Sequence, residues 1–401
     1  MKPKIVAGAP VQRFIEKSMF VRYFLISSLV SLAIHMYGPY WSAYLYLNGI
    51  DVATVVLLTS ISRICVTVLN IPTGLFADRY GRRTSHSIGM LINALGLLLL
   101  ILFPKHLLLL TLAFIIMACG DSFRIGALEA WVVDECKKRG YRNLVPQVFG
   151  KRTTLDYVIG VVCGFLGGLL TVYSLRLPLF LSSIAALTSA ILGLAFLSEN
   201  YGFKSSLVVI TRKAFTLLFN SKSVKLYILG HTLITAVWAF YISTWTKLVL
   251  TLGLHKSLIG PLYSLLLLSA SFGGAVFTVF TKKWSYSVIG FSALLLSSPS
   301  LLLIGFSNVL YTVLVGLILF ELSLGALTPY LTSLRNDLLE SSYRATAISL
   351  IHTIDTILRV SLMYVLSLIS TTKSISESYL TCSVLVALSA LPLYYSRKAK
   401  T

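Results

Sequence analysis

Long apolar segments recur along the whole chain and are separated by short polar stretches. Each is about 20 residues or longer, the length that a helix rising about 1.5 Å per residue needs to cross roughly 30 Å of hydrocarbon. The expected spans are 22–48, 53–76, 84–103, 107–131, 149–173, 176–197, 226–251, 257–281, 285–306, 309–334, 345–370 and 376–396. The pattern therefore predicts an all-α membrane protein with twelve transmembrane helices.

The longest polar stretch between spans lies at the midpoint of the chain, from residue 199 to 225. We expect it to be a cytoplasmic linker between two six-helix bundles, formed by 1–198 and 226–401. Part of this linker, 207–219, alternates apolar and basic residues, a pattern typical of an amphipathic helix on a membrane surface.

A short internal repeat supports the division into halves. A Gly-Ala-Leu triplet at 126–128 recurs at 325–327, and Asp156 recurs as Asp355, both at an offset of 199. An offset near half the chain favours two bundles related by a pseudo-twofold axis along the membrane normal. In that plan the solute site lies near mid-membrane between the bundles.

Composition and charge placement agree with a membrane protein. Hydrophobic residues make up 56% of the chain and charged residues 12%, against roughly 25% charged in soluble domains. The formal charge of +20 does not indicate a nucleic-acid partner, because 26 of the 34 Lys and Arg fall on the side that carries both termini. We therefore expect a multi-pass plasma-membrane protein with both termini cytoplasmic, its basic excess facing anionic membrane lipid.

The segment between the second and third spans, from Gly74 to Arg83, reads GLFADRYGRR. It resembles the signature loop of the major facilitator superfamily, G-x-x-x-D-[RK]-x-G-R-[RK], with every fixed position filled. The resemblance implies a secondary transporter that works by alternating access. The alternative is a loop that only obeys the positive-inside rule.

The resemblance also implies roles for residues of this loop. Asp78 is expected at the amino terminus of span 11, where the helix dipole favours an anion. An arginine of the loop is expected to meet an acid at the cytoplasmic end of span 4. We interpret the following residues as a latch between the bundles: Gly74, Asp78, Arg79, Gly81, Arg82, Arg83, Glu129 and Asp134.

The matching loop of the second half reads Thr-Lys-Lys-Trp at 281–284, without an acid or a Gly-Arg pair. Any latch there must be weaker or different. Separately, the segment from Glu129 to Tyr141 is similar to the molybdate-anion transporters of the same superfamily. That local resemblance implies an anionic substrate.

Ionisable residues inside spans are costly and usually paired or functional. Asp121 and Arg124 are three residues apart, and Asp355 and Arg359 are four apart, so each pair shares a helix face. Either pair can be a structural ion pair or part of a solute site. Near mid-membrane we also place His35, Arg63 and Glu321.

Glu321 maps to within one residue of Asp121 in the repeat, and it has no basic residue within a helical turn. A low dielectric favours the neutral form of an unpaired carboxyl group. Glu321 is therefore the candidate proton carrier, for symport or antiport. The alternative is an ion pair with Arg63 or Arg359 from another helix.

Aromatic residues accompany these charges in spans 1 and 7. Tyr40 follows His35 in span 1, and span 7 holds Trp238 and Tyr241. The family resemblance implies that spans 1, 4, 7 and 10 line the cavity. Rings with polar tips suit a solute of mixed polarity.

Two other function classes stay open. A receptor or sensor without transport activity has the same sequence features. A membrane-embedded enzyme is disfavoured, because the six His residues form no H-x-x-x-H pair and the chain has no Gly-rich phosphate loop. We expect a monomeric transporter of a small, unidentified solute, with no cofactor and no metal.

Overall fold

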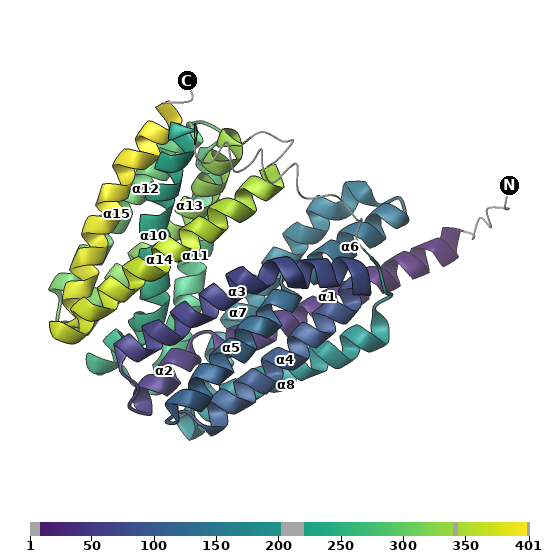
Figure 1. Cartoon of the computed structure of the whole chain (residues 1–401), viewed down its shortest axis with the longest axis horizontal. Coiled ribbons are helices and arrows are strands. Elements are labelled where there is room, and N and C mark those ends of the chain that lie inside the picture. Colours follow the sequence, from purple (N-terminus) through teal and green to yellow (C-terminus); the bar gives the residue numbers. More distant parts are fainter. Residues whose placement is uncertain (1–8, 202–219, 340–343, 399–401) are drawn as a thin grey trace.

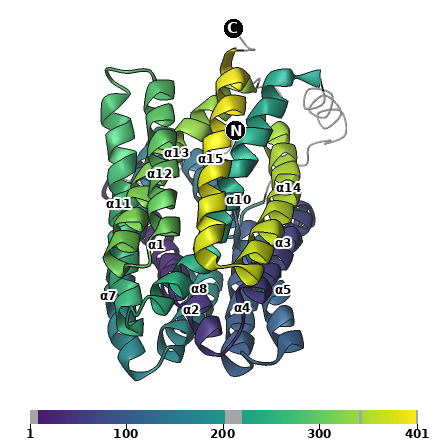
Figure 2. The ribbon, with the colours of Figure 1, turned by 90° about the vertical axis from the view of Figure 1, so that its left-hand side faces the viewer.

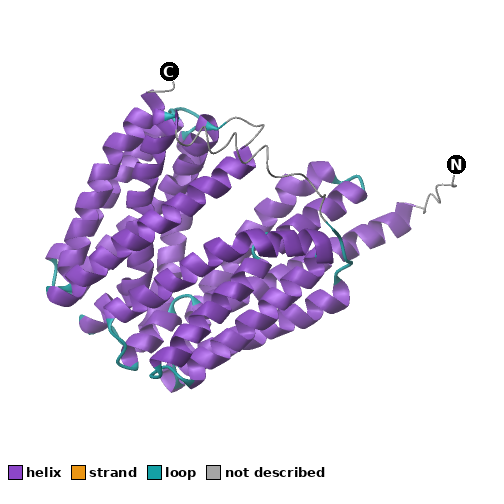
Figure 3. Ribbon diagram, viewed as in Figure 1, coloured by secondary structure: helices purple, strands orange, loops and turns teal. Residues whose placement is uncertain are grey.

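The computed structural model describes residues 9–201, 220–339 and 344–398 of the chain. Every regular element within these ranges is a helix (Figure 3). Twelve segments are long and apolar enough to cross a membrane, so the prediction of twelve spans is confirmed. The amphipathic helix expected over 207–219 lies outside the described residues.

The first six spans form one bundle, shown from purple to teal in Figure 1. Its helices are α1 (Ala9–Tyr37), α2 (Tyr40–Leu47), α3 (Val52–Tyr80), α4 (Arg82–Leu102), α5 (Leu107–Arg124), α6 (Ala127–Lys138), α7 (Val145–Tyr173) and α8 (Arg176–Phe196). A short 3-10 turn, Arg142–Leu144, precedes α7.

The last six spans form a second bundle, shown from green to yellow. Its helices are α10 (Lys222–Thr251), α11 (Ile259–Phe280), α12 (Tyr286–Phe306), α13 (Leu310–Leu338), α14 (Arg344–Thr372) and α15 (Ile375–Lys398). Figure 2 shows α15 lying between α12 and α10, and it packs against both.

Two spans of the first bundle are interrupted. Gly38 and Pro39 separate α1 from α2, and Ile125 and Gly126 separate α5 from α6. Gly126 has a φ of 80°, a left-handed conformation that glycine adopts readily and that ends the helix. The span expected over 107–131 is confirmed, but it consists of two helices and continues to Lys138. The equivalent triplet 325–327 lies inside the unbroken helix α13.

The bundles meet along two main seams, one between α3 and α14 and one between α7 and α11. Small residues bring α7 close to the chain around the start of α11. A Cβ atom added at Gly168 would lie 2.6 Å from the carbonyl oxygen of Ser257 and 2.7 Å from Pro261 Cδ. Helices that approach this closely need glycine at the contact.

Hydrogen bonds at the end of the bundles remote from the termini join the two halves. Ser42 bonds Thr246 at 2.8 Å, and the Tyr46 hydroxyl donates to the carbonyl of Ser243 at 2.7 Å. The Lys247 ammonium also lies 5.6 Å from the centre of the Tyr46 ring. Figure 1 shows the two bundles diverging toward the end where α1 begins and α15 ends.

Candidate functional site

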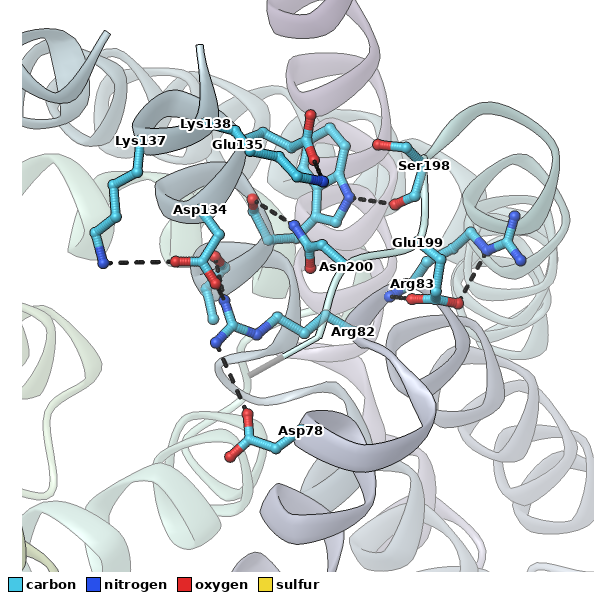
Figure 4. Close-up of polar contacts among 12 residues, drawn as sticks. Asp78, Arg82, Arg83, Asp134, Glu135, Lys137, Lys138, Ser198, Glu199 and Asn200 are labelled. Carbon is cyan, nitrogen blue, oxygen red and sulfur yellow. Dashed lines mark hydrogen bonds and ion pairs between the residues drawn. The ribbon is translucent and has the colours of Figure 1, made fainter. Parts of the chain in front are cut away.

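The loop between α3 and α4 is held inside its own bundle. Gly81, with a φ of 107°, turns the chain so that α4 begins at Arg82. The Arg82 guanidinium bonds the Asp134 carboxylate and, at 2.6 Å, the carbonyl of Ala130, both on α6. Asp78 adds a contact of 3.7 Å to Arg82 (Figure 4). Of the two acids expected near this loop, Asp134 is the one that pairs.

Glu199, beyond the end of α8, is a member of this loop network that the sequence analysis missed. Its carboxylate accepts from the backbone N–H of Arg83 at 2.9 Å and from that of Thr84 at 3.3 Å. It also accepts from the Thr84 hydroxyl at 2.6 Å. Figure 4 shows its contact with Arg83, whose Nε lies 3.2 Å away. Glu199 therefore places an anion at the amino end of α4, where the backbone N–H groups lack helical partners.

Gly81 makes room for that carboxylate, because a Cβ atom at this position would overlap the Glu199 side chain. The glycine thus serves both the turn and the close approach. Glu199 follows Gly81 by more than a hundred residues and belongs to no sequence pattern. The only available signal was an isolated acid at the end of the sixth span.

The other residues of the expected latch make fewer contacts. Asp78 is 46% exposed, and its one ion pair within the described ranges is with Arg82. Arg79 lies over the neighbouring Tyr80 ring at 5.3 Å. Glu129 has no ion pair among the described residues, and nothing lies near a Cβ atom built on Gly74. The contact expected between Asp78 and the amino end of span 11 falls on side chains, those of residues 340–346, that lie outside the described part of the structure.

Both intrahelical pairs expected near mid-membrane form. Arg124 Nη2 lies 2.8 Å from Asp121 Oδ1, and Asn93 donates to the same oxygen at 3.3 Å. Arg359 Nη1 lies 3.7 Å from Asp355 Oδ2. Each aspartate therefore has a cation on its own helix.

Asp355 also receives three polar contacts from α10. His231 Nδ1 lies 2.9 Å from its carboxylate, and the hydroxyls of Thr235 and Thr232 donate at 3.0 and 3.1 Å. The Asp355 side chain is only 1% exposed. The sequence analysis did not single out His231, whose partner lies 124 residues away.

Arg63, on α3, is exposed, and its side chain has no hydrogen-bond or ion-pair partner in the described part of the chain. It is the twelfth of the 29 residues of its helix. One turn further along, Thr67 donates to Thr356 of α14 at 3.3 Å, which fixes the register between these antiparallel helices. Arg359 lies one turn beyond Thr356, so its charge and that of Arg63 act on each other.

Glu321, on α13, has no ion pair among the described residues, and neither Arg63 nor Arg359 reaches it. The hydroxyl groups of Tyr241 and Tyr263 lie close enough to feel its charge. Tyr241 is buried, and its ring lies 5.1 Å from that of Phe320.

The remaining candidates differ in their surroundings. Tyr40 is fully buried and donates to the carbonyl of Gly164 at 2.9 Å, so in this structure it packs against α7. Trp238 is 42% exposed. His35 contacts Tyr263 of the other bundle at 2.9 Å and Asp156 of its own at 3.5 Å.

Comparison with known proteins gives a consistent result. A profile of the Major Facilitator Superfamily matches residues 23–360. The uncharacterized MFS-type transporter YxaM of Bacillus subtilis (strain 168) is 23% identical over 253 residues, which are 61% of this chain. The chain spans 62% of the length of that relative.

Solved structures share the fold. A mutant of the nucleoside transporter NupG superposes with a TM-score of 0.81 at 10% identity, covering 95% of this chain and 100% of that chain. A bacterial homolog of the human lysosomal transporter Spinster superposes with a TM-score of 0.76 at 14% identity, covering 98% of each chain. The local likeness of 129–141 to the molybdate-anion transporters stays a prediction.

Proposed function

Because this chain belongs to the major facilitator superfamily and is a transporter with twelve spans, we propose that it carries a small anionic solute by alternating access. The observation that supports an anion is Arg63. Two other mid-span arginines, Arg124 and Arg359, each have an aspartate on their own helix. Arg63 has none among the described residues, and an unpaired cation inside a membrane span is costly.

The position of Arg63 supports a role in binding. It lies on the seam between α3 and α14, within electrostatic range of Arg359. Two guanidinium groups that face each other across the bundles repel, and a bound carboxylate, phosphate or similar oxyanion removes that repulsion. Guanidinium groups bind such anions through paired, charge-assisted hydrogen bonds. A solute held by both arginines joins the two bundles, as alternating access requires.

We further propose that the termini face the cytoplasm of a cell whose plasma membrane holds the transporter. The strong bias of Lys and Arg toward the side of the termini supports this orientation. With that orientation, the bundles in this structure are joined at their outer ends. The Gly74–Arg83 loop then acts as a latch that engages the second bundle when the inner ends close.

Flux measurements in proteoliposomes test the anionic substrate. We expect uptake of one class among mono- and dicarboxylates, phosphate, sulfate and molybdate, and little uptake of neutral sugars and nucleosides. Arg63→Gln should lower that uptake at least about tenfold, equivalent to about 1.4 kcal/mol. The matched control is Arg176→Gln, which removes an arginine at the outer start of α8 and should leave uptake unchanged.

Two outcomes would count against this function. Transport of neutral solutes alone, or full anion uptake by the Arg63→Gln protein, would exclude anion recognition at Arg63. Thermal stabilisation by an anion without any flux would instead support a receptor.

For proton coupling, we propose Glu321 as a carrier, supported by the lack of an ion pair in the described ranges. Glu321→Gln mimics the protonated side chain and should abolish accumulation driven by a pH gradient while leaving solute exchange largely intact. Full pH-driven accumulation in this variant would move the role to Asp121, to Asp355 or away from protons altogether.

A further inference from the structure

Two clusters of like composition lie in the two bundles. In the first, the carboxylate of Asp156 on α7 contacts His35 at 3.5 Å, Ser31 at 2.5 Å and Arg152 at 3.3 Å. In the second, the carboxylate of Asp355 on α14 contacts His231, Thr235 and Arg359. Each cluster thus holds one carboxylate, one imidazole, one guanidinium and at least one hydroxyl group.

The halves of the chain place these groups at matching positions. Asp156 and Asp355 are 199 residues apart, and the two positions on the first helix of each half, 31 and 35, match 231 and 235 at an offset of 200. The side chains at these two positions are exchanged: serine then histidine in one half, histidine then threonine in the other. The set of groups is the same although their order differs.

An arginine alone is enough to neutralise each aspartate, so the histidine is an additional protonatable group. The two histidines differ in what else they touch. The His231 ring lies beside the tilted ring of Tyr227 on its own helix, with ring centres 5.3 Å apart. His35 instead reaches the Tyr263 hydroxyl on α11, so it joins the two bundles.

We propose that His35 is a second proton-binding residue of the transporter, oriented by Asp156, at the contact between the bundles. This inference rests on the proposed transport function and adds a proton site besides Glu321. The cluster is also more open than its counterpart: the Asp156 side chain is 33% exposed, compared with 1% for Asp355.

The contacts of His35 are compatible with both the neutral and the protonated form of its imidazole ring. An ionised carboxylate only accepts, so the N–H at Nε2 of His35 must face Asp156. The Tyr263 hydroxyl can donate to Nδ1 of the neutral ring or accept from Nδ1–H of the protonated ring. Protonation turns the neutral bond to Tyr263 into a charge-assisted one, which is roughly twice as strong.

The charged and titratable groups around His35 come from several helices. Arg152 opposes the added proton, while Asp156 favours it. Around Tyr263, the groups within electrostatic range are Glu321 on α13 and Asp156, Tyr157 and Cys163 on α7. The carboxylate of Asp156 favours an imidazolium at this contact. We therefore expect acid pH to favour the structure described here.

Spin-label distance measurements in nanodiscs test this without any solute. Labels replace Tyr173 and Phe306, two exposed residues at the outer ends of the bundles, in a protein whose native cysteines are changed to alanine. When the pH is lowered from about 8 to about 5, we expect the population with joined outer ends to rise roughly tenfold relative to the population with separated outer ends. His35→Gln should remove the pH response, and Tyr263→Phe should reduce it.

The matched control is His231→Gln, which removes the histidine of the second cluster and should keep the pH response. Equal responses in His35→Gln and the unchanged protein, or no response in either, would overturn the proposal. If His35→Gln loses the population with joined ends at every pH, that variant is misfolded. The pH response of Tyr263→Phe then tests the proposal in its place. Failure of anion uptake leaves these distances unaffected, so the two proposals can fail separately.

Discussion

At the end that carries the chain termini, the two bundles hold their helices together with different chemical groups. In the first bundle, the residue that begins α4, Arg82, forms an ion pair with Asp134 of α6. In the second, the residue that begins α12, Tyr286, donates its hydroxyl to Asp337 of α13 at 2.6 Å. An arginine is present there too, but Arg397 lies over the Tyr286 ring at 5.8 Å.

This difference shows which residues the charged side chains of the Gly74–Arg83 loop contact. In the first bundle Arg82 and Glu199 hold α4 against α6 and the end of α8, so part of the loop serves its own bundle. Asp78 stays half-exposed and is the carboxylate left for the opposite bundle. The second bundle uses a phenol in place of the guanidinium, and its loop offers no such acid. The latch that we propose is therefore a feature of the first bundle alone.

The largest effect is expected from Arg82→Ala. Loss of the guanidinium frees Asp134 and loosens the loop, so the step that exchanges the two conformations should slow by about tenfold, or about 1.4 kcal/mol of barrier. Solute binding should change little, because the loop is remote from Arg63. Asp78→Asn should act in the same direction. Parallel flux and binding measurements check this, and normal turnover with greatly weakened binding would contradict it.

An intermediate effect is expected from Glu199→Gln. The amide keeps the shape of the side chain but loses the charge that faces the amino end of α4, which should lower stability by about 1 kcal/mol. Thermal unfolding in detergent measures the change. Glu377→Gln is the control, because Glu377 pairs with the exposed Lys373 at 3.4 Å and such pairs contribute little. Equal losses in both variants would show that Glu199 has no special role.

The smallest effect is expected from Tyr286→Phe. This change removes one hydrogen bond to an exposed carboxylate, worth about 1 kcal/mol or less, and leaves the ring in place. Turnover should stay within about twofold of the unchanged protein. If Tyr286→Phe slows transport as much as Arg82→Ala, the two bundles are equivalent at this end and the comparison fails.

The sequence predicted those features that depend on local pattern. Twelve spans follow from apolar length, and the pairs Asp121–Arg124 and Asp355–Arg359 follow from helical spacing. The break at Gly126 could not be predicted, since the same triplet continues a helix in α13.

Contacts between helices that lie far apart along the chain could not be predicted from the sequence either. Glu199 and Asp156 find their partners only through the packing of whole helices. Asp156 was noticed only as the repeat partner of Asp355, and nothing in the sequence indicated that His35 would lie beside it. Their roles as site residues remain proposals.

The contacts between the two bundles include no ion pair among the described residues. The Ser42–Thr246, Tyr46–Ser243 and Thr67–Thr356 bonds are made by hydroxyl and carbonyl groups. Such bonds exchange readily with water at little net change in free energy. These hydrogen bonds should therefore depend only weakly on ionic strength, since screening acts on charges. The repulsion between Arg63 and Arg359 across the seam of α3 and α14 is a charge effect, so salt should weaken it and ease the approach of the two bundles.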